Sequence, residues 1–328
     1  MVWYPLYAVG LLLLLDGLAR IYFGLLVLRH FESKPAFNIV PSPPDNRGRL
    51  VELPASDGLT LRGSYYQQTF RTPVGLVVFF PELDGNHWSA MNYTEALFDA
   101  GYEILSVDVR NQGDSEIQPG YEPLQWFTER EADDVRSILA WVAAEPRLRS
   151  LPLGVMGVSR GATAALLAGI ESPHVRAVCC EGVYTTAGLQ LRYTMRWAVL
   201  YIPRWLVRLL PRWHYRTTLA MTLRLSQWRR NCRYVLLERQ LHTLRNEPIL
   251  LIGGERDNYV PADIVTDLAR QIGGEVVQTW IVPRARHNGG RVAARLEYDR
   301  RLTEFFQTAL GQSATEIPVI ETRPCVPY

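Results

Sequence analysis

Short apolar runs alternate with helical stretches over most of this chain, and that alternation limits the folds open to it. The run at 75–80 is apolar almost throughout, which is typical of a strand buried on both faces. Parallel strands need a crossover of helix length between them, whereas antiparallel strands do not. The order of elements therefore predicts an α/β fold, with a mostly parallel central sheet and helices on both of its faces.

The expected elements follow one another from about residue 49 to residue 310. We expect the first two strands, 50–53 and 59–65, to form a hairpin through the tight turn Ser56-Asp57-Gly58. The later strands are expected at 75–80, 103–107, 151–158, 175–180, 248–253 and 275–282. Helices are expected at about 89–100, at about 127–144, from 160, at about 261–272 and at about 291–309.

The N-terminal segment is predicted to be a membrane anchor. Residues 3–28 carry only two charges, Asp16 and Arg20, and the run is long enough to cross a hydrocarbon core of about 30 Å. On a helix these charges lie four residues apart, so they can pair and lower each other's cost in lipid. Residues 1–30 are therefore predicted to form a transmembrane helix, and the proline-containing segment 31–48 a short linker.

A cleaved signal peptide and a buried or interfacial helix stay open as alternatives for this segment. No Lys or Arg precedes the apolar run and no A-x-A site follows it, which disfavours the signal peptide. Basic residues follow the run instead, at Arg29, Lys34, Arg47 and Arg49. By the positive-inside tendency, we expect a single-pass membrane protein with its α/β domain on the cytoplasmic side.

A GxSxG pentapeptide lies between the strand expected at 151–158 and the helix after it. Gly157 and Gly161 stand two residues to either side of Ser159. In a sharp strand-to-helix turn the backbone segments come close together, so glycines are needed at these spacings. The serine oxygen then lies at the carboxyl edge of the sheet beside a helix N-terminus, the place of a nucleophile. A plain glycine-rich turn is the structural alternative.

A serine nucleophile needs a base, and the base needs a group that orients it. His287 is the candidate base because it follows the last expected strand, in a loop that leads into the final helix. His87 is its rival. Asp257, in the loop after the seventh expected strand, is the candidate acid, because it completes the order serine, acid, histidine. Glu181, at the end of the sixth expected strand, is the fallback acid.

Together these motifs resemble those of the α/β-hydrolase superfamily, over about residues 49–310. The resemblance rests on the pentapeptide around Ser159, on Asp108-Val109-Arg110-Asn111-Gln112-Gly113-Asp114-Ser115, on Asp257 through Pro261, and on His287. The chain looks most like the serine aminopeptidase and monoglyceride-lipase-like branch, in which members with one N-terminal membrane helix occur. The resemblance implies an α/β-hydrolase fold and a serine hydrolase that needs no metal or organic cofactor.

The loop after the third expected strand departs from the family's pattern. The family usually has His-Gly here, whereas this chain has Pro81-Glu82. By position in that pattern, the backbone N–H groups of Leu83 and Arg160 would receive the developing oxyanion. Glu82 and Asp84 would oppose negative charge there unless they point away or pair with Arg160, whose side chain can equally be solvated. A catalytically silent scaffold with the same fold therefore stays open as an alternative.

Residues 184–246 are predicted to be a helical cap insertion, because they lie where this superfamily places its cap or lid. They hold twelve arginines and one acidic residue, Glu238, and so carry a net charge of +11 in a chain whose total is +2. Basic sequence with tryptophan suits a helix at an anionic membrane surface. A solvated cap whose arginines pair with the acidic remainder is the alternative. No recognition motif for nucleic acid accompanies the charge, so nucleic acid is not an expected partner.

The expected function is that of a membrane-anchored serine hydrolase. Ser159 would attack an acyl carbonyl, His287 would carry the proton and Asp257 would hold the imidazole. The apolar and aromatic content of the insertion favours a carboxylic ester or a lipid-like acyl substrate, with peptides and thioesters as alternatives. The four cysteines form no CxxC pair and no Cys/His cluster, so no structural metal site is expected. The tail, 311–328, is expected to be extended or disordered.

Overall fold

The computed structural model describes residues 3–35, 39–244, 246–274 and 276–311. The chain divides into two compact units. The smaller unit is Met1–Pro35 with Ala187–Tyr234, and the larger unit is Ala36–Thr186 with Val235–Tyr328. The larger unit contains the motifs identified above, whereas the smaller unit contains the N-terminal helix and most of the arginine-rich insertion. Residues 312–328 of the expected tail lie outside the described part.

The described part of the larger unit contains one eight-stranded sheet, in the order β1-β2-β4-β3-β5-β6-β7-β8. The strands are β1 (Arg49–Pro54), β2 (Thr60–Tyr66), β3 (Leu76–Phe80), β4 (Glu103–Val107), β5 (Leu153–Val158), β6 (Val175–Glu181), β7 (Ile249–Gly254) and β8 (Val277–Val282). β2 pairs antiparallel with both β1 and β4, and every other pair is parallel. The predicted mostly parallel sheet is confirmed.

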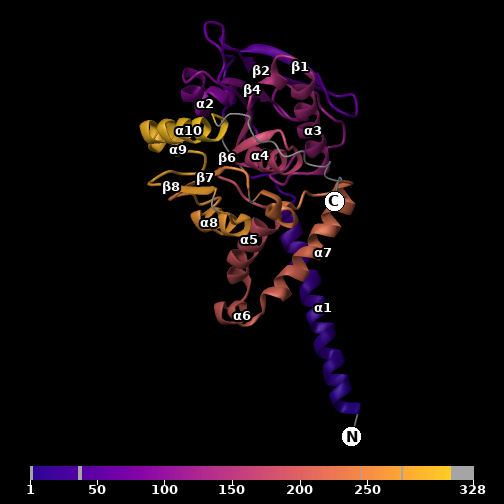
Figure 1. The fold of residues 1–328 in the computed structure, drawn as a ribbon. Helices are drawn as coiled ribbons and strands as arrows, with labels where there is room; N and C mark the ends of the chain where they lie inside the picture. The colour runs from indigo at the N-terminus through magenta and orange to yellow at the C-terminus, as the bar shows by residue number, and fades with distance from the viewer. Residues whose placement is uncertain (1–2, 36–38, 245, 275, 312–328) are drawn as a thin grey trace. The chain divides into compact units, whose positions relative to one another are not determined.

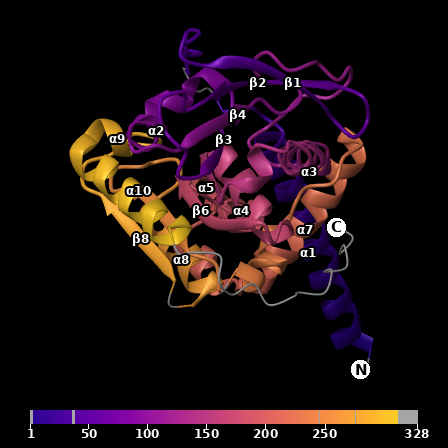
Figure 2. The same ribbon diagram turned by 45° about the horizontal axis from the view of Figure 1, so that its top comes forward.

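Helices cover both faces of this sheet. They are α2 (Ala90–Asp99), α3 (Glu129–Ala144), α4 (Arg160–Glu171), α8 (Ala262–Ile272), α9 (Gly290–Ala293) and α10 (Arg295–Leu310), with 3₁₀ helices η1 (His87–Ser89), η2 (Leu148–Ser150), η3 (Leu237–Arg239) and η4 (Leu241–Leu244). α2 and α10 lie side by side on one face, and α3 and α4 lie on the other (Figures 1 and 2). The last predicted helix is divided at Ala294 into α9 and α10.

β3 is buried over its whole length, as its apolar run predicts. Val77 and Phe79 belong to one hydrophobic cluster with residues of α2 and α10, among them Tyr93 and Phe306. The rings of Phe79 and Tyr93 stack with their centroids 5.5 Å apart. A strand packed on both faces has little freedom to shift. The loop that follows Phe80 therefore starts from a rigid position.

The smaller unit consists of helices. They are α1 (Trp3–Phe31), α5 (Thr186–Tyr201, of which the first residue belongs to the larger unit), α6 (Arg204–Leu209) and α7 (Arg212–Arg230). Pro203 and Pro211 separate α5, α6 and α7, because proline lacks the N–H that would continue a helix. Among the described helices, α1 is long and apolar enough to cross a membrane by length and composition, with a mean hydropathy of 2.1 in its most apolar 18-residue stretch.

The two ends of the larger unit that flank the insertion lie next to each other. Thr186 is its last residue before the insertion and Val235 is its first residue after it. The Thr186 hydroxyl donates to the Val235 carbonyl at 3.1 Å, and the Val235 N–H donates to the Phe127 carbonyl at 2.9 Å. The chain therefore leaves and re-enters the larger unit at adjacent points.

Candidate active site

The pentapeptide around Ser159 forms a sharp turn between β5 and α4. Ser159 has a φ of 54° and a ψ of −116°, a conformation that residues with a side chain rarely adopt. Its N–H donates to the Glu181 carbonyl at 2.7 Å, which ties the turn to the neighbouring strand β6. The serine is therefore held in a strained position at the carboxyl end of β5, as the motif predicts.

Both glycines of the pentapeptide are required by the close approach of the backbone. A Cβ at position 157 would lie 2.1 Å from the Gly161 carbonyl oxygen, and a Cβ at position 161 would lie 2.1 Å from the Phe80 carbonyl oxygen. These neighbours are backbone atoms in packed elements, so they cannot move aside as a flexible side chain can. Any larger residue at either position would therefore force the turn apart.

Ser159, His287 and Asp257 come together in one chain of hydrogen bonds. Ser159 Oγ lies 2.9 Å from His287 Nε2, and His287 Nδ1 lies 2.7 Å from Asp257 Oδ2. Ser159 and Asp257 are buried, and the His287 side chain is 15% exposed. A hydroxyl next to an imidazole that a carboxylate orients is the arrangement of an activated nucleophile.

The loop after β7 fixes the orientation of Asp257. Asp257 Oδ1 accepts hydrogen bonds from the Tyr259 and Val260 N–H groups, each at 2.8 Å, while Oδ2 faces His287. The Tyr259 ring lies against the imidazole, with the two ring centroids 5.1 Å apart. A carboxylate at Nδ1 favours the tautomer that carries its proton there. His287 Nε2 is then the acceptor for the Ser159 hydroxyl proton.

The two rival residues are engaged elsewhere. His87 is buried, and its Nε2 lies 3.0 Å from Asp114 Oδ2. Burial lowers the pKa of His87 below its ordinary value. The Glu181 carboxylate accepts the Gly290 N–H at 2.8 Å and the Tyr298 hydroxyl at 2.7 Å.

No group of three or more His, Cys, Asp or Glu side chains in the described part of the chain could hold a metal ion.

A tight turn over residues 82–85 follows β3. The Gly85 N–H donates to the Glu82 carbonyl at 3.0 Å, and Asp84 adopts a φ of 64°. Gln112, from the motif at 108–115, donates through Nε2 to the same Glu82 carbonyl at 2.8 Å. The motif loop therefore holds this turn in place from the side.

The backbone amides of Leu83 and Arg160 belong to two fixed elements, the turn after β3 and the first residue of α4. The first N–H groups of a helix have no acceptor within it. Among the residues that the structure describes, neither amide donates a hydrogen bond to another protein group. Two preorganised N–H groups of this kind are what a developing oxyanion requires.

Glu82, the first residue of this turn, is buried, and its carboxylate is one of the two, with that of Asp84, that the sequence sets against an oxyanion. The Tyr93 hydroxyl donates to Oε1 over a long 3.5 Å. Burial raises the pKa of Glu82 above its ordinary value, and the nearby Glu181 carboxyl adds to the rise. The neutral acid is therefore more favoured here than in an exposed glutamate.

A comparison with known families covers this site. The family model described as "Alpha/beta hydrolase family" matches residues 77–302, from β3 into α10, and includes Ser159, Asp257 and His287. The match covers more than half of the chain.

The chain belongs to the alpha/beta hydrolase family.

Esterases are among the solved structures with a similar fold. An esterase of Pyrococcus furiosus is 18% identical with a TM-score of 0.61, and the alignment covers 85% of this chain and 98% of that chain. The esterase domain of a Rhodothermus marinus protein is 15% identical with a TM-score of 0.52, over 80% of this chain and 99% of that chain. At these identities the likeness shows the alpha/beta hydrolase fold, which confirms the predicted fold.

Curated relatives match this alpha/beta hydrolase over a shorter stretch. A putative phosphoribosyl transferase of Mycobacterium tuberculosis is 31% identical over 113 residues, which are 34% of this chain and 25% of that protein. The chain therefore spans about a quarter of the length of the curated relatives it matches. The name of those proteins refers to their full length, and the match covers only a quarter of it.

Arg160 has a partner that the sequence analysis missed. Its guanidinium forms an ion pair with Glu131 of α3, and both side chains are buried, so Arg160 is not solvated. Glu131 also accepts the Thr128 N–H in a capping box at the start of α3, and the Tyr121 hydroxyl. Burial alone would raise the pKa of Glu131, but the Arg160 charge and these hydrogen bonds hold it below its ordinary value.

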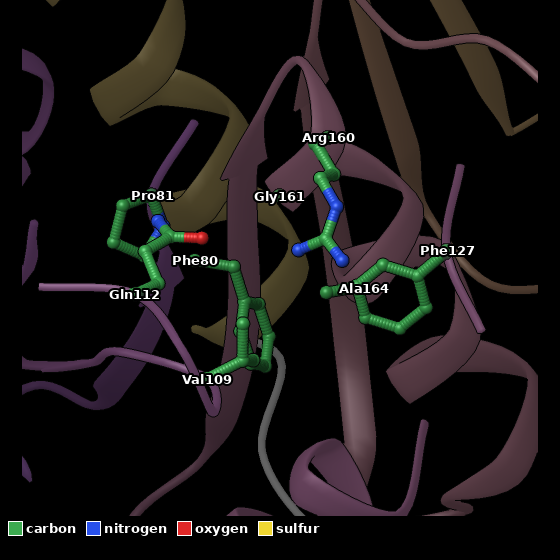
Figure 3. A pocket seen from close by; sticks show the side chains of 8 residues that line it. All are labelled: Phe80, Pro81, Val109, Gln112, Phe127, Arg160, Gly161 and Ala164. Carbon is green, nitrogen blue, oxygen red and sulfur yellow. The ribbon is translucent and has the colours of Figure 1, made fainter. Parts of the chain in front are cut away.

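Figure 3 shows the Arg160 side chain between α4 and the Phe127 ring. Its Cζ lies 5.0 Å from the ring centroid, close enough for a cation–π interaction. The residues shown line a cavity of about 10 Å³: Phe80, Pro81, Val109, Gln112, Phe127, Arg160, Gly161 and Ala164. Such a cavity has room for about one water. The Glu131 carboxylate and the Phe127 ring therefore supply most of the compensation for burying the charge.

Glu131→Ala is expected to lower the free energy of unfolding of this alpha/beta hydrolase by about 3–5 kcal/mol, because it leaves the Arg160 charge buried without its partner. Urea unfolding in detergent measures the loss. Glu129→Ala removes a half-buried carboxylate from the same helix and is the matched control, with an expected loss below about 1 kcal/mol. Equal losses in the two variants would contradict a stabilising role for the Arg160–Glu131 pair.

Glu181 connects the two halves of the site. Its carbonyl accepts the Ser159 N–H, and its carboxylate accepts the N–H of Gly290, three residues after His287. Burial raises the pKa of Glu181 above its ordinary value, and hydrogen bonds from Tyr298 and Gly290 oppose that rise. Glu181 is therefore bonded to the backbone of Ser159 and to the loop that carries His287.

If this site is catalytic, Glu181→Ala is expected to lower kcat for hydrolysis by about 100-fold with little change in KM, because a displacement of about 1 Å in the reacting groups has an effect of this size. Glu181→Gln keeps an oxygen for the Gly290 N–H and is expected to lose less than about tenfold. Steady-state kinetics on both variants tests this. Indistinguishable kcat values for alanine and glutamine would show that the Gly290 hydrogen bond does not position His287.

Proposed function

We propose that this protein is a membrane-anchored serine hydrolase that cleaves a carboxylic ester or a related acyl bond. Its family and the esterases of similar fold support a hydrolase. The observation that carries the proposal is the chain of hydrogen bonds from Asp257 through His287 to Ser159. In this proposal Ser159 is the nucleophile, His287 the general base and acid, and Asp257 the group that orients the imidazole.

The first half of the reaction acylates the enzyme. As Ser159 Oγ forms a bond to the acyl carbon, His287 Nε2 takes the hydroxyl proton and the carbonyl electron pair moves onto oxygen. The Leu83 and Arg160 amides donate to that oxyanion. Collapse of the tetrahedral intermediate breaks the bond to the leaving group, which takes the proton from the imidazolium. Asp257 stabilises the imidazolium while it exists.

The second half returns the enzyme to its starting state. A water molecule attacks the acyl-enzyme and gives a proton to His287, and the same two amides receive the second oxyanion. Collapse breaks the bond to Ser159 Oγ, which regains its proton from His287, and the carboxylic acid leaves. Apart from the substrate and the attacking water, these steps use side chains and backbone amides of this chain.

An ester with a lipid-like acyl chain is the proposed substrate class, with peptides and thioesters as alternatives on the same residues. The chain's resemblance to the serine aminopeptidase and monoglyceride-lipase-like branch supports both the ester and the peptide. The ester is preferred because the insertion is rich in apolar and aromatic side chains and because a membrane would supply such substrates beside the enzyme.

The proposed anchor is α1. Asp16 of α1 lies 2.8 Å from His214 of α7 through Oδ1 and Nε2, and 2.6 Å from Arg20 through Oδ2 and Nε. These contacts support a helix that is retained and packed in the mature protein over a signal peptide that is removed. The basic residues after α1 support a catalytic domain on the cytoplasmic side.

Labelling with a fluorophosphonate probe tests the proposed function. We expect one label per folded molecule, and peptide mapping by mass spectrometry should place it on Ser159. A panel of p-nitrophenyl esters from acetyl to palmitoyl, with matched thioester and peptide substrates, then identifies the acyl bond. Folded protein that takes no label and turns over no substrate would favour the catalytically silent scaffold. A label on another residue would refute the assignment of Ser159.

A further inference from the structure

The first half of α1 is not covered by any other described part of the smaller unit. Every residue from Tyr4 to Leu15 is exposed, on all sides of the helix. The apolar side chains in this half are largely exposed: Leu12 is 66% exposed and Leu13 is 67% exposed. An apolar helix that is exposed all round needs a surrounding apolar phase.

Contact with α7 begins at Asp16. Asp16 Oδ1 lies 2.8 Å from His214 Nε2, and Arg20 donates to the Thr217 hydroxyl at 2.6 Å. Further along, the Thr222 hydroxyl donates to the Gly24 carbonyl at 3.4 Å. Residue numbers rise together along both helices, so α1 and α7 run parallel. The start of α7 therefore lies level with Asp16, in the middle of the apolar span of α1.

A group of arginines and tryptophans lies at this level of the smaller unit. The arginines are exposed, and none of them forms an ion pair with another described residue of the smaller unit: Arg204, Arg208, Arg212 and Arg216. Trp205 is 66% exposed and Trp213 is 61% exposed. Arginine and tryptophan are the residues that favour the headgroup layer of an anionic membrane, where the charge meets lipid phosphates and the indole lies at the boundary.

We propose that the edge of the hydrocarbon of an anionic membrane lies at Asp16. Trp3–Leu15 of α1 would then enter the hydrocarbon, while α6 and the first turns of α7 lie among the headgroups. This inference rests on the proposed membrane anchoring and refines it. Exposed arginines within the hydrocarbon are costly in free energy. The start of α7 is therefore expected to lie outside the hydrocarbon, together with Asp16 of α1, which lies beside it.

This placement differs from a full crossing by Tyr4–Phe31. At a rise of 1.5 Å per residue, Trp3–Leu15 is about 20 Å long. A hydrocarbon core is about 30 Å thick, and apolar stretches of this shorter length are typical of interfacial or re-entrant segments. The anchor would then hold the protein by an inserted end and by a charged collar, defined here as Arg204, Arg208, Arg212 and Arg216.

The depth of three positions on α1 tests the proposal. Leu12, Leu18 and Leu25 are all more than half exposed, so a cysteine at each disturbs little packing. An environment-sensitive dye is attached at each in turn, in the whole chain with its native cysteines replaced, in vesicles of phosphatidylcholine and phosphatidylserine. Nitroxide lipids are expected to quench the dye most at position 12, less at 18 and least at 25, and aqueous iodide in the reverse order.

The alternatives give different orders of depth. A full crossing makes position 18 the deepest and positions 12 and 25 alike, and this result would overturn the boundary at Asp16 while keeping the membrane anchor. A dye at position 12 that iodide quenches fully in every vesicle would overturn the membrane anchoring itself. None of these results bears on the serine hydrolase proposal, which the fluorophosphonate label tests separately.

The charged collar is tested with a matched pair of variants. A dye at Leu209, which is 70% exposed on α6, reports whether α6 is seated among the headgroups. Arg212→Gln is expected to lower the ratio of seated to unseated α6 about fivefold in vesicles with phosphatidylserine, and to have little effect without it. Arg224 is also exposed but lies about 18 Å further along α7, so Arg224→Gln is expected to change nothing. Equal effects of the two variants would overturn the collar.

Discussion

Ser159→Ala is expected to lower kcat/KM for ester hydrolysis by about 10⁵- to 10⁶-fold, because it removes the atom that attacks the substrate. The oxyanion amides and the binding surface remain, so a small residual rate above that of water is expected. Steady-state and single-turnover kinetics on purified protein in detergent measure the loss. The fluorophosphonate label is expected to disappear in the same variant.

Two comparisons make this result specific. Ser150→Ala changes an exposed serine after α3 and is expected to keep full activity. The double variant of Ser159→Ala with His287→Ala is expected to be no slower than either single variant, because the two residues act as one unit. If the losses in kcat/KM of the two single variants multiply in the double variant, or if Ser159→Ala keeps more than about 1% of the activity, the nucleophile is a different residue.

Asp257→Asn is expected to lower kcat by about 10⁴-fold while leaving the fold intact. The amide oxygen can still accept the Tyr259 and Val260 N–H groups, as Asp257 Oδ1 does now. The amide nitrogen would then face His287 Nδ1 and donate to it, which forces the other tautomer. Nε2 would carry the proton and could no longer accept one from the Ser159 hydroxyl.

Kinetics from pH 6 to pH 9 with a melting curve for each variant measure this effect. Asp263→Asn, at an exposed position in the first turn of α8, is the matched control and is expected to keep wild-type activity. Near-normal activity in Asp257→Asn, together with a large loss in Glu181→Gln, would reassign the orienting acid to Glu181.

The fold could be predicted from the sequence where local pattern and tertiary environment agree. The strand expected at 103–107 is β4, Glu103–Val107, because Ile104, Leu105 and Val107 carry the apolar signal of a strand that is buried along its length. The break between α9 and α10 was not predicted. It occurs at Ala294, and alanine is the strongest helix former, so no residue at that point marks the end of a helix.

The candidate site was predictable to the extent that chain order and backbone geometry define it. The glycines at 157 and 161 predict the sharp turn at Ser159. The order serine, acid, histidine predicts Asp257 and His287, and the structure contains the hydrogen-bonded chain that joins them to Ser159. The partner of Arg160 was missed. Thr128 and Glu131 form a capping-box pattern that marks the start of a helix, but its packing against α4 depends on the whole fold.

The adjacent chain ends at Thr186 and Val235 have a consequence for how such a protein can change. A polypeptide that leaves Thr186 can re-enter at Val235 through a short turn, because the two residues already share a hydrogen bond. Exchange, shortening or loss of the intervening helices then preserves every strand connection of the sheet. Residues 187–234 can therefore be exchanged as a module, in evolution or by engineering, while the larger unit keeps its topology.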